Sequence, residues 1–228
     1  MAANKIMKEF RAYMDFINSG FKYNLQVFPD TFTASALLFT LLFQSPPFAS
    51  LSGSILLLNL IHPHIAKFFA SFVGEAVGRN DSCTGRFPGL SFTRMTDMSS
   101  KKKFGSLDDT NWPSYYSVFL GFLSAYAGAL PIVYNKELTA SPRRNVATIV
   151  GLVVLALVVL TCIAYRIVGG CDSLLASIIG LLVGAVYGIF MILGLSFISE
   201  RRLTNILGLP LIRDKTTDGK PIYVCERT

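Results

Sequence analysis

Long apolar segments constrain this sequence more than any other feature. Five runs of mostly apolar residues are separated by turns and loops. The longer runs hold roughly twenty residues, which is the length that an α-helix needs to cross a hydrocarbon core about 30 Å thick. A backbone inside a bilayer must satisfy its own hydrogen bonds, and the sequence lacks the alternating short segments of a membrane barrel. We therefore predict an all-α fold, a polytopic transmembrane helical bundle.

Prolines, turns and charged residues bound the predicted spans. Pro29 and Pro113 suit the first turn of a helix, and Gln44–Pro47 suits a turn. About five spans are expected, of which the first is short: Thr31–Gln44, Ala49–Val73, Pro113–Tyr134, Val146–Val168 and Ser173–Ile198.

The remaining segments divide the chain into three parts. In residues 1–22, apolar side chains such as Ile6 and Phe10 fall on one helical face, which predicts an amphipathic helix in the membrane interface; packing on the protein's own bundle is the alternative. Residues 23–198 form the predicted bundle, with one polar loop at 74–112. Residues 199–228 form an extramembrane tail, whose segment Pro221–Cys225 has the composition of a short strand.

Composition narrows the classes of function. Of the 228 residues, 52% are hydrophobic and only 15% are charged, whereas a soluble domain is about a quarter charged. The net charge of +7 is spread over tails and loops, which favours contact with anionic lipid headgroups over nucleic-acid binding. The four cysteines show no C-x-x-C spacing, so neither a zinc site nor a disulfide framework is indicated. We predict no metal and no cofactor.

Two histidines near membrane depth are candidates for a metal site or a proton relay. His62 and His64 flank Pro63 in the second span, and polar residues in a span are functional hypotheses by default. Residues two apart lie about 200° apart around a helix, so both cannot face one metal unless the helix is distorted. Because proline removes a backbone donor, we favour a packed, hydrogen-bonded kink.

The alternation of spans assigns the polar segments to two membrane sides. The loop at 74–112, the amino terminus and the junction Arg166–Asp172 share one side, called side A. The connection Asn135–Asn145 and the tail lie on the opposite side, called side B. Counted over the whole chain, basic residues are divided almost evenly between the sides, so the positive-inside rule assigns no orientation.

Three polar segments on side A carry a resemblance to a known family. Each contains residues that suit a phosphate site: Arg79 with Arg86 after six intervening residues, Pro113-Ser114-Tyr115-Tyr116 at the start of a span, and Arg166 followed by Asp172, Ala176 and Gly180. In order, spacing and shared side, these segments resemble the three signatures of the type 2 phosphatidic-acid phosphatases, over about half of the chain.

The resemblance implies a lipid phosphatase site whose reactive residues are replaced. The family uses a nucleophilic histidine, a second histidine for proton transfer and an aspartate that orients the nucleophile. This chain has Asp172, Tyr116 and Ala176 at those positions. We therefore predict a catalytically inactive site, although a carboxylate such as Asp172 can act as a nucleophile in principle.

The anion-binding half of the signatures is retained. The phosphate- or anion-binding candidates carry guanidinium or hydroxyl groups, which suit a phosphate: Arg79, Arg86, Ser114 and Arg166. Asp172 is set among these arginines and is expected to pair with them. The site is then either a pocket for a lipid phosphate or one closed by its own salt bridge.

Small residues follow the third segment. Gly180, Gly184 and Gly188 recur every four residues, which lets another helix approach closely; we expect packing within the chain rather than dimerisation. Cys83 and Cys171 fall on side A and could come near each other, but unpaired thiols are the expected state.

We predict that the protein has a structural role in a membrane. The segments Trp112–Tyr116 and Gly170–Ser173 are similar to those of degenerate family members among the membrane proteins of large double-stranded DNA viruses. The resemblance implies an inactive component of a virion internal membrane, with the lipid bilayer and capsid or other membrane proteins as partners. The alternative is an active or lipid-phosphate-binding enzyme of a cellular membrane. A small transporter, the third possibility, would need a water-lined path through the spans.

Overall fold

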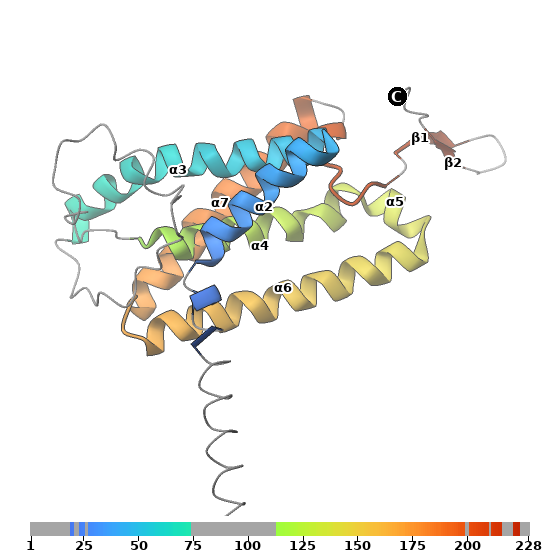
Figure 1. Ribbon diagram of the computed structural model, residues 1–228. Helices are drawn as coiled ribbons and strands as arrows, with labels where there is room; N and C mark the ends of the chain where they lie inside the picture. Colours follow the sequence, from blue (N-terminus) through green and yellow to red (C-terminus); the bar gives the residue numbers. More distant parts are fainter. Residues whose placement is uncertain are drawn as a thin grey trace, which may run out of the picture.

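The apolar runs form long helices (Figure 1). The computed structural model describes residues 19–20, 23–25, 27–73, 113–198, 201–209, 211–215 and 221–223. Four of its helices are long and apolar enough to cross a membrane. The chain is therefore an integral membrane protein, and the predicted helical bundle is confirmed.

Each predicted span lies in a helix, with bounds that differ by four residues or fewer. The helices are α2 (Phe28–Phe43), α3 (Pro46–Val73), α4 (Tyr115–Val133), α6 (Pro142–Val168) and α7 (Leu174–Ile198). With 16 residues, α2 is about 24 Å long, which is less than the thickness of the hydrocarbon core. Four of the five predicted spans thus reach full length, and the first is a shorter apolar helix. The predicted amphipathic helix and the polar loop at 74–112 lie outside the described residues.

Two short elements were missed by the sequence analysis, and one was anticipated. Helix α5 (Asn135–Thr139) lies in the predicted connection, and the 3-10 helix η3 (Arg202–Thr204) follows α7. Strands β1 (Ile212–Lys215) and β2 (Pro221–Tyr223) pair antiparallel. The strand predicted at Pro221–Cys225 is therefore confirmed over its first three residues, and it adds a small hairpin to the all-α bundle.

The closest helix pair is α4 with α7, whose backbones touch. A Cβ atom added to Gly184 would lie 1.9 Å from the carbonyl oxygen of Val118. A Cβ atom added to Gly121, on the opposing helix, would lie 2.2 Å from the carbonyl oxygen of Leu181. Both distances are far below van der Waals contact, so only glycine fits at these two positions. The close approach that the glycine ladder permits is thus made within the chain.

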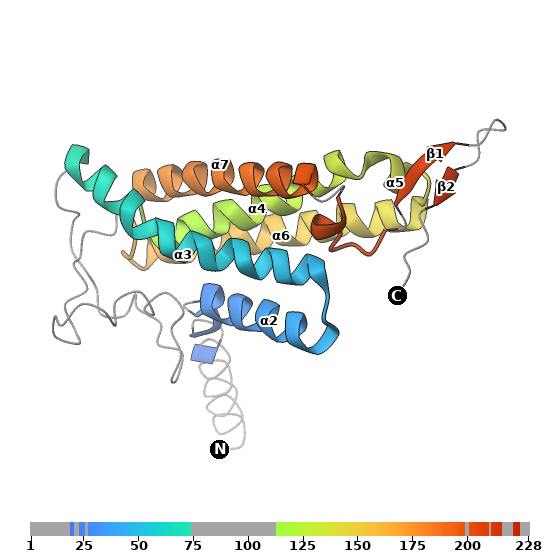
Figure 2. The ribbon, with the colours of Figure 1, turned by 90° about the horizontal axis from the view of Figure 1, so that it is seen from above.

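The same contact fixes the relative direction of the two helices. A Cβ atom on Gly180 would lie 2.7 Å from the Ser117 side chain, and one on Gly188 would lie 2.6 Å from the Phe122 carbonyl oxygen. Because the partner positions rise together along both helices, α4 and α7 run parallel. Their first turns therefore lie at one end of the bundle, and their last turns lie at the other (Figure 2).

We name these ends face A, where α4 and α7 begin, and face B, where they end. At face A, the side chain of His62 in α3 bonds to the carbonyl oxygen of Pro113, just before α4. At face B, Ser50 near the start of α3 donates to the carbonyl oxygen of Leu203, after α7. Faces A and B thus correspond to the predicted sides A and B.

Helix α4 is the centre of the core. Its aromatic residues are almost fully buried: Phe119, Phe122 and Tyr126. Phe28 and Phe32 of α2 pack edge-on against Phe119, with ring centroids 6.3 and 5.8 Å away. By contrast, α6 buries only two of its own residues.

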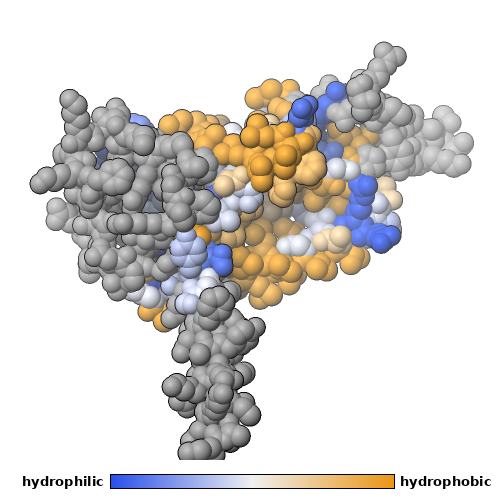
Figure 3. All heavy atoms as spheres, viewed as in Figure 1, coloured by the Kyte–Doolittle hydropathy of each residue, from blue (hydrophilic) through white to orange (hydrophobic). Residues whose placement is uncertain are grey.

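The surface away from the core is apolar over the middle of the bundle. Figure 3 shows these side chains in orange, with hydrophilic side chains in blue mainly towards the ends. Helix α6 exposes many large apolar residues, among them Ile149, Val153 and Leu157. Such a surface is stable against lipid chains, which are as apolar as the side chains themselves.

The α4–α7 contact predicts a position-specific effect of adding one methyl group. Gly184→Ala should lower the free energy of unfolding in detergent by about 1–3 kcal/mol, because the methyl group must push two helices apart. Gly194→Ala, on the same helix, is the matched control, since a Cβ atom there meets nothing within 4 Å. Equal stability of the two variants in thermal or denaturant unfolding would contradict the contact.

Candidate functional site

The turn between α6 and α7 positions the third polar segment. Gly170 has φ +68, the left-handed region that glycine adopts without strain. The backbone N–H of Gly170 donates to the Ile167 carbonyl oxygen (3.1 Å), and that of Cys171 donates to the Arg166 carbonyl oxygen (2.8 Å). These two bonds form a Schellman motif, which ends α6 and reverses the chain. The reversal returns Asp172 towards Arg166.

The following residue starts α7. The hydroxyl of Ser173 accepts a hydrogen bond from the backbone N–H of Ala176 (3.1 Å). A serine that accepts from the third helical residue is a favourable amino-terminal cap. Ala176 is itself buried in the first turn of α7, so it contributes to packing.

Arg166 and Asp172 form a two-pronged ion pair. Arg166 Nε lies 2.5 Å from one carboxylate oxygen, and its Nη2 lies 3.2 Å from the other. The side chains are only 13% and 7% exposed, so the pair is largely shielded from solvent. Parallel N–H···O bonds of this kind fix geometry and add energy. The expected pairing of Asp172 with an arginine is thus present at Arg166.

The ring of Tyr116 packs against the guanidinium group of Arg166. The Arg166 guanidinium carbon lies 4.6 Å from the centre of the Tyr116 ring, within the range of a cation–π interaction. The Tyr116 hydroxyl donates to the carbonyl oxygen of Leu25 at 2.5 Å. Tyr116 therefore links the segment before α2, the start of α4 and the end of α6.

Of the other three predicted anion-binding residues, the structure describes only Ser114. Ser114 is buried immediately before α4, at the same end of the bundle as Arg166. Its side chain makes no capping hydrogen bond to the helix. Arg79 and Arg86 lie outside the described residues. The structure thus brings together Tyr116, Arg166 and Asp172.

The two histidines face different surroundings. His62 is buried, donates Nε2–H to the Pro113 carbonyl oxygen at 3.0 Å, and packs edge-on against Tyr115. His64 is exposed. Helix α3 continues through Pro63. The predicted packing and hydrogen bond are observed for His62, whereas the kink at Pro63 stays a prediction. Because His62 is buried and His64 is exposed, the two side chains do not converge on one point.

One cysteine departs from expectation. Cys171 is disulfide-bonded, so the expectation of unpaired thiols is wrong at this position. Cys83 lies outside the described residues. Cys162 is free and buried, and it packs with Tyr116 in an apolar cluster.

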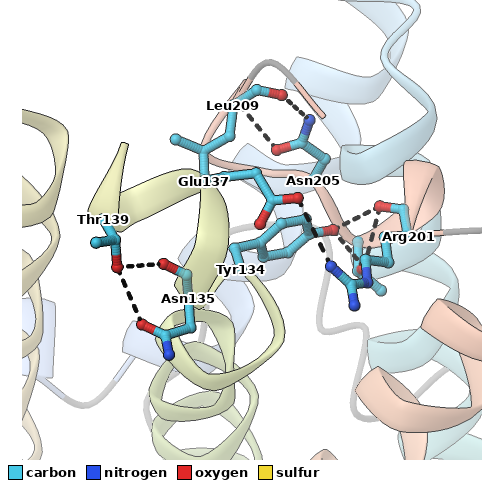
Figure 4. Close-up of polar contacts among 8 residues, drawn as sticks. Tyr134, Asn135, Glu137, Thr139, Arg201, Asn205 and Leu209 are labelled. Carbon is cyan, nitrogen blue, oxygen red and sulfur yellow. Dashed lines mark hydrogen bonds and ion pairs between the residues drawn. The ribbon is translucent and has the colours of Figure 1, made fainter. Parts of the chain in front are cut away.

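Face B carries a second polar cluster, which the sequence analysis missed (Figure 4). The Tyr134 hydroxyl donates to the Arg201 carbonyl oxygen at 2.5 Å and lies 2.7 Å from the Thr204 hydroxyl. The Glu137 side chain, which is 1% exposed, lies 3.6 Å from the Arg201 guanidinium. The segment after α7 is thereby fastened to the end of α4. The signal in the sequence was a tyrosine and a glutamate three residues apart at a span end.

A local turn completes this cluster. The Asn205 side chain donates to the Leu209 carbonyl oxygen (2.7 Å) and accepts from the Leu209 N–H (2.9 Å). Arg144 at the start of α6 donates to the Gly208 carbonyl oxygen at 2.6 Å. Residues 201–209 therefore contact α3, α4 and α6, so this part of the predicted tail is packed on the bundle.

Comparison of the chain with models of known protein families, with characterised proteins and with solved structures gave no match.

The ion pair at face A predicts a coupled effect on stability. Arg166→Gln and Asp172→Asn should each cost about 3 kcal/mol, because each leaves a shielded charge without its partner. The double variant should lose much less than the sum of the two. Additive losses in a double-mutant cycle, measured by unfolding in detergent, would show that the two side chains do not interact.

The cluster at face B predicts an alkaline limit to stability. Burial raises the pKa of Tyr134 above its ordinary value of 10, so the folded state keeps the phenol proton at a pH where the unfolded chain loses it. The stabilisation is complete below pH 10 and is lost as the pH rises towards the folded pKa. Tyr134→Phe should destabilise by about 1–3 kcal/mol at neutral pH and should reduce the alkaline loss. An unchanged alkaline loss in this variant would contradict the assignment.

Proposed function

We propose that this chain is a catalytically inactive, phosphatase-like integral membrane protein with a structural role in a virion internal membrane. The observation that carries the proposal is the closed ion pair at face A. At the position that corresponds to the phosphatase nucleophile, both oxygens of Asp172 are bonded to Arg166. One of the candidate phosphate-binding residues is therefore bonded to the residue at the nucleophile position.

The neighbouring positions support the same conclusion. A general acid needs a proton that it can release to the substrate, whereas the Tyr116 hydroxyl is buried and donates to the Leu25 carbonyl oxygen. Ala176 has no group that could orient a nucleophile. The three reactive positions of the phosphatase signatures thus contribute an ion pair, an interhelical hydrogen bond and a buried methyl group.

A role in an assembly is supported by the carboxyl-terminal hairpin. Strands β1 and β2 form a two-stranded sheet that lies outside the helical bundle (Figure 1). Strands at the edge of a sheet can pair with a strand of another chain. The hairpin is therefore our candidate for contact with a capsid or other membrane protein. The resemblance of Trp112–Tyr116 and Gly170–Ser173 to viral membrane proteins favours a virion as the site.

Binding of a lipid phosphate without turnover is the second candidate function. It is favoured by the parallel α4 and α7, whose amino-terminal ends share face A with Arg166. The amino-terminal end of a helix carries partial positive charge. A bound phosphate would compete with Asp172 for the guanidinium group.

An assay with phosphatidic acid separates these functions. The detergent-solubilised chain should release no phosphate above a protein-free control. Asp172 is already bonded to Arg166, and no histidine stands at the nucleophile position. Turnover that Asp172→Asn abolishes, in a variant that still elutes as a folded species, would contradict the proposal. Binding of phosphatidic acid without turnover would favour the second candidate.

The location is tested separately. In particles stripped of their outer shell, the chain should remain with the internal membrane and should be released by detergent. Recovery from host membranes alone, with none in purified particles, would contradict the virion assignment.

A further inference from the structure

Exposed cationic side chains gather at face B. They belong to three segments that meet at this end, namely α5, the start of α6 and η3: Lys136, Arg143, Arg144 and Arg202. We call these four residues the basic rim. Figure 3 shows hydrophilic side chains in blue next to the apolar surface at the end where α5 lies.

The segments that carry the rim are fastened together. Arg144 bonds to the Gly208 carbonyl oxygen, which ties α6 to the segment after η3. Arg201, immediately before η3, lies 3.6 Å from Glu137, which ties α5 to the start of η3. The cations are therefore presented by a fixed framework, and one hydrogen bond leaves most of the donors of Arg144 available.

Among the described residues of face B before the hairpin, no exposed acidic side chain offsets the positive charge of the rim. Glu137, the acidic residue there, is buried and faces Arg201. At face A, by contrast, Arg166 is paired with Asp172, and Lys67 is the exposed cation among the described residues. Within the described structure, most exposed cations thus lie at face B. The residues that carry the resemblance to the phosphatases lie at face A.

The rim also sits at the right depth for lipid. Arg143 and Arg144 directly precede the apolar surface of α6, on which Val146, Ile149 and Val150 are more than half exposed. A helix whose apolar surface contacts acyl chains places residues at its end among the headgroups. Guanidinium groups bind phosphate oxygens through parallel hydrogen bonds.

We propose that the basic rim binds the headgroups of anionic phospholipids at face B. This inference is independent of the proposed function, since it involves neither Arg166 nor Asp172.

Native mass spectrometry of the purified full chain tests this proposal, with phosphatidylglycerol and phosphatidylcholine of equal chain length as probes. The wild type should retain phosphatidylglycerol in preference to phosphatidylcholine. The triple variant Lys136→Gln/Arg143→Gln/Arg202→Gln should reduce that preference by at least about tenfold, because each cation near a headgroup contributes about fivefold in affinity. Arg144 is left intact because its bond to Gly208 supports the fold. Lys67→Gln at face A is the control and should keep the wild-type preference.

Two outcomes would overturn the proposal. One is a wild-type chain that binds both lipids equally, as expected if the rim serves an acidic protein partner instead. The other is a folded triple variant with the wild-type preference. If the triple variant does not fold, a salt titration of the wild type still decides. Binding to the rim must weaken as ionic strength rises, so a preference that is independent of salt would contradict it.

Discussion

The parallel contact between α4 and α7 is the constraint on which the rest of this structure depends. In a bilayer the exclusion of water does not drive helices together, so they associate through close packing and hydrogen bonds. Glycines on both helices remove the side chains that would separate the backbones: Gly121 on α4 and Gly180, Gly184 and Gly188 on α7. Because α6 must return the chain between two parallel helices, it crosses in the opposite direction. The end of α6 and the start of α7 are then brought beside the start of α4, and Arg166 meets Tyr116 there.

The polar residues at face A compensate one another and hold neighbouring helix ends together. A membrane-embedded charge is stable only when another group compensates it. Here Asp172 supplies that compensation to Arg166. The tight turn at Gly170 makes this possible, since it returns the carboxylate to the last turn of α6. Tyr116 and Ser173 complete the arrangement by tying neighbouring helix ends together. These contacts thus stabilise the bundle at face A.

The helices were predictable because length and hydropathy alone decide them, and the start of α2 follows from Pro29 in its first turn. The observed starts of α3 at Pro46 and of α6 at Pro142 precede the predicted ones by three and four residues. The convergence of Tyr116, Arg166 and Asp172 followed from the alternation of spans. Other features depend on tertiary contacts that no local pattern encodes. Neither the bond from Tyr134 to the Arg201 carbonyl oxygen nor that from Arg144 to Gly208 could be read from spacing, because each joins segments more than sixty residues apart.

Cysteine cross-linking tests the direction of α7 against α4 most directly. A Cβ atom on Gly188 would lie 3.3 Å from Ala125 Cβ, close to the separation of about 3.8 Å in a disulfide. In a background in which the native cysteines are replaced by serine, mild oxidation should cross-link Ala125→Cys/Gly188→Cys. The pair Ala125→Cys/Gly180→Cys, which only antiparallel helices would bring together, should remain reduced. Cross-linking of the second pair and not of the first would contradict the parallel contact and, with it, the assembly of face A.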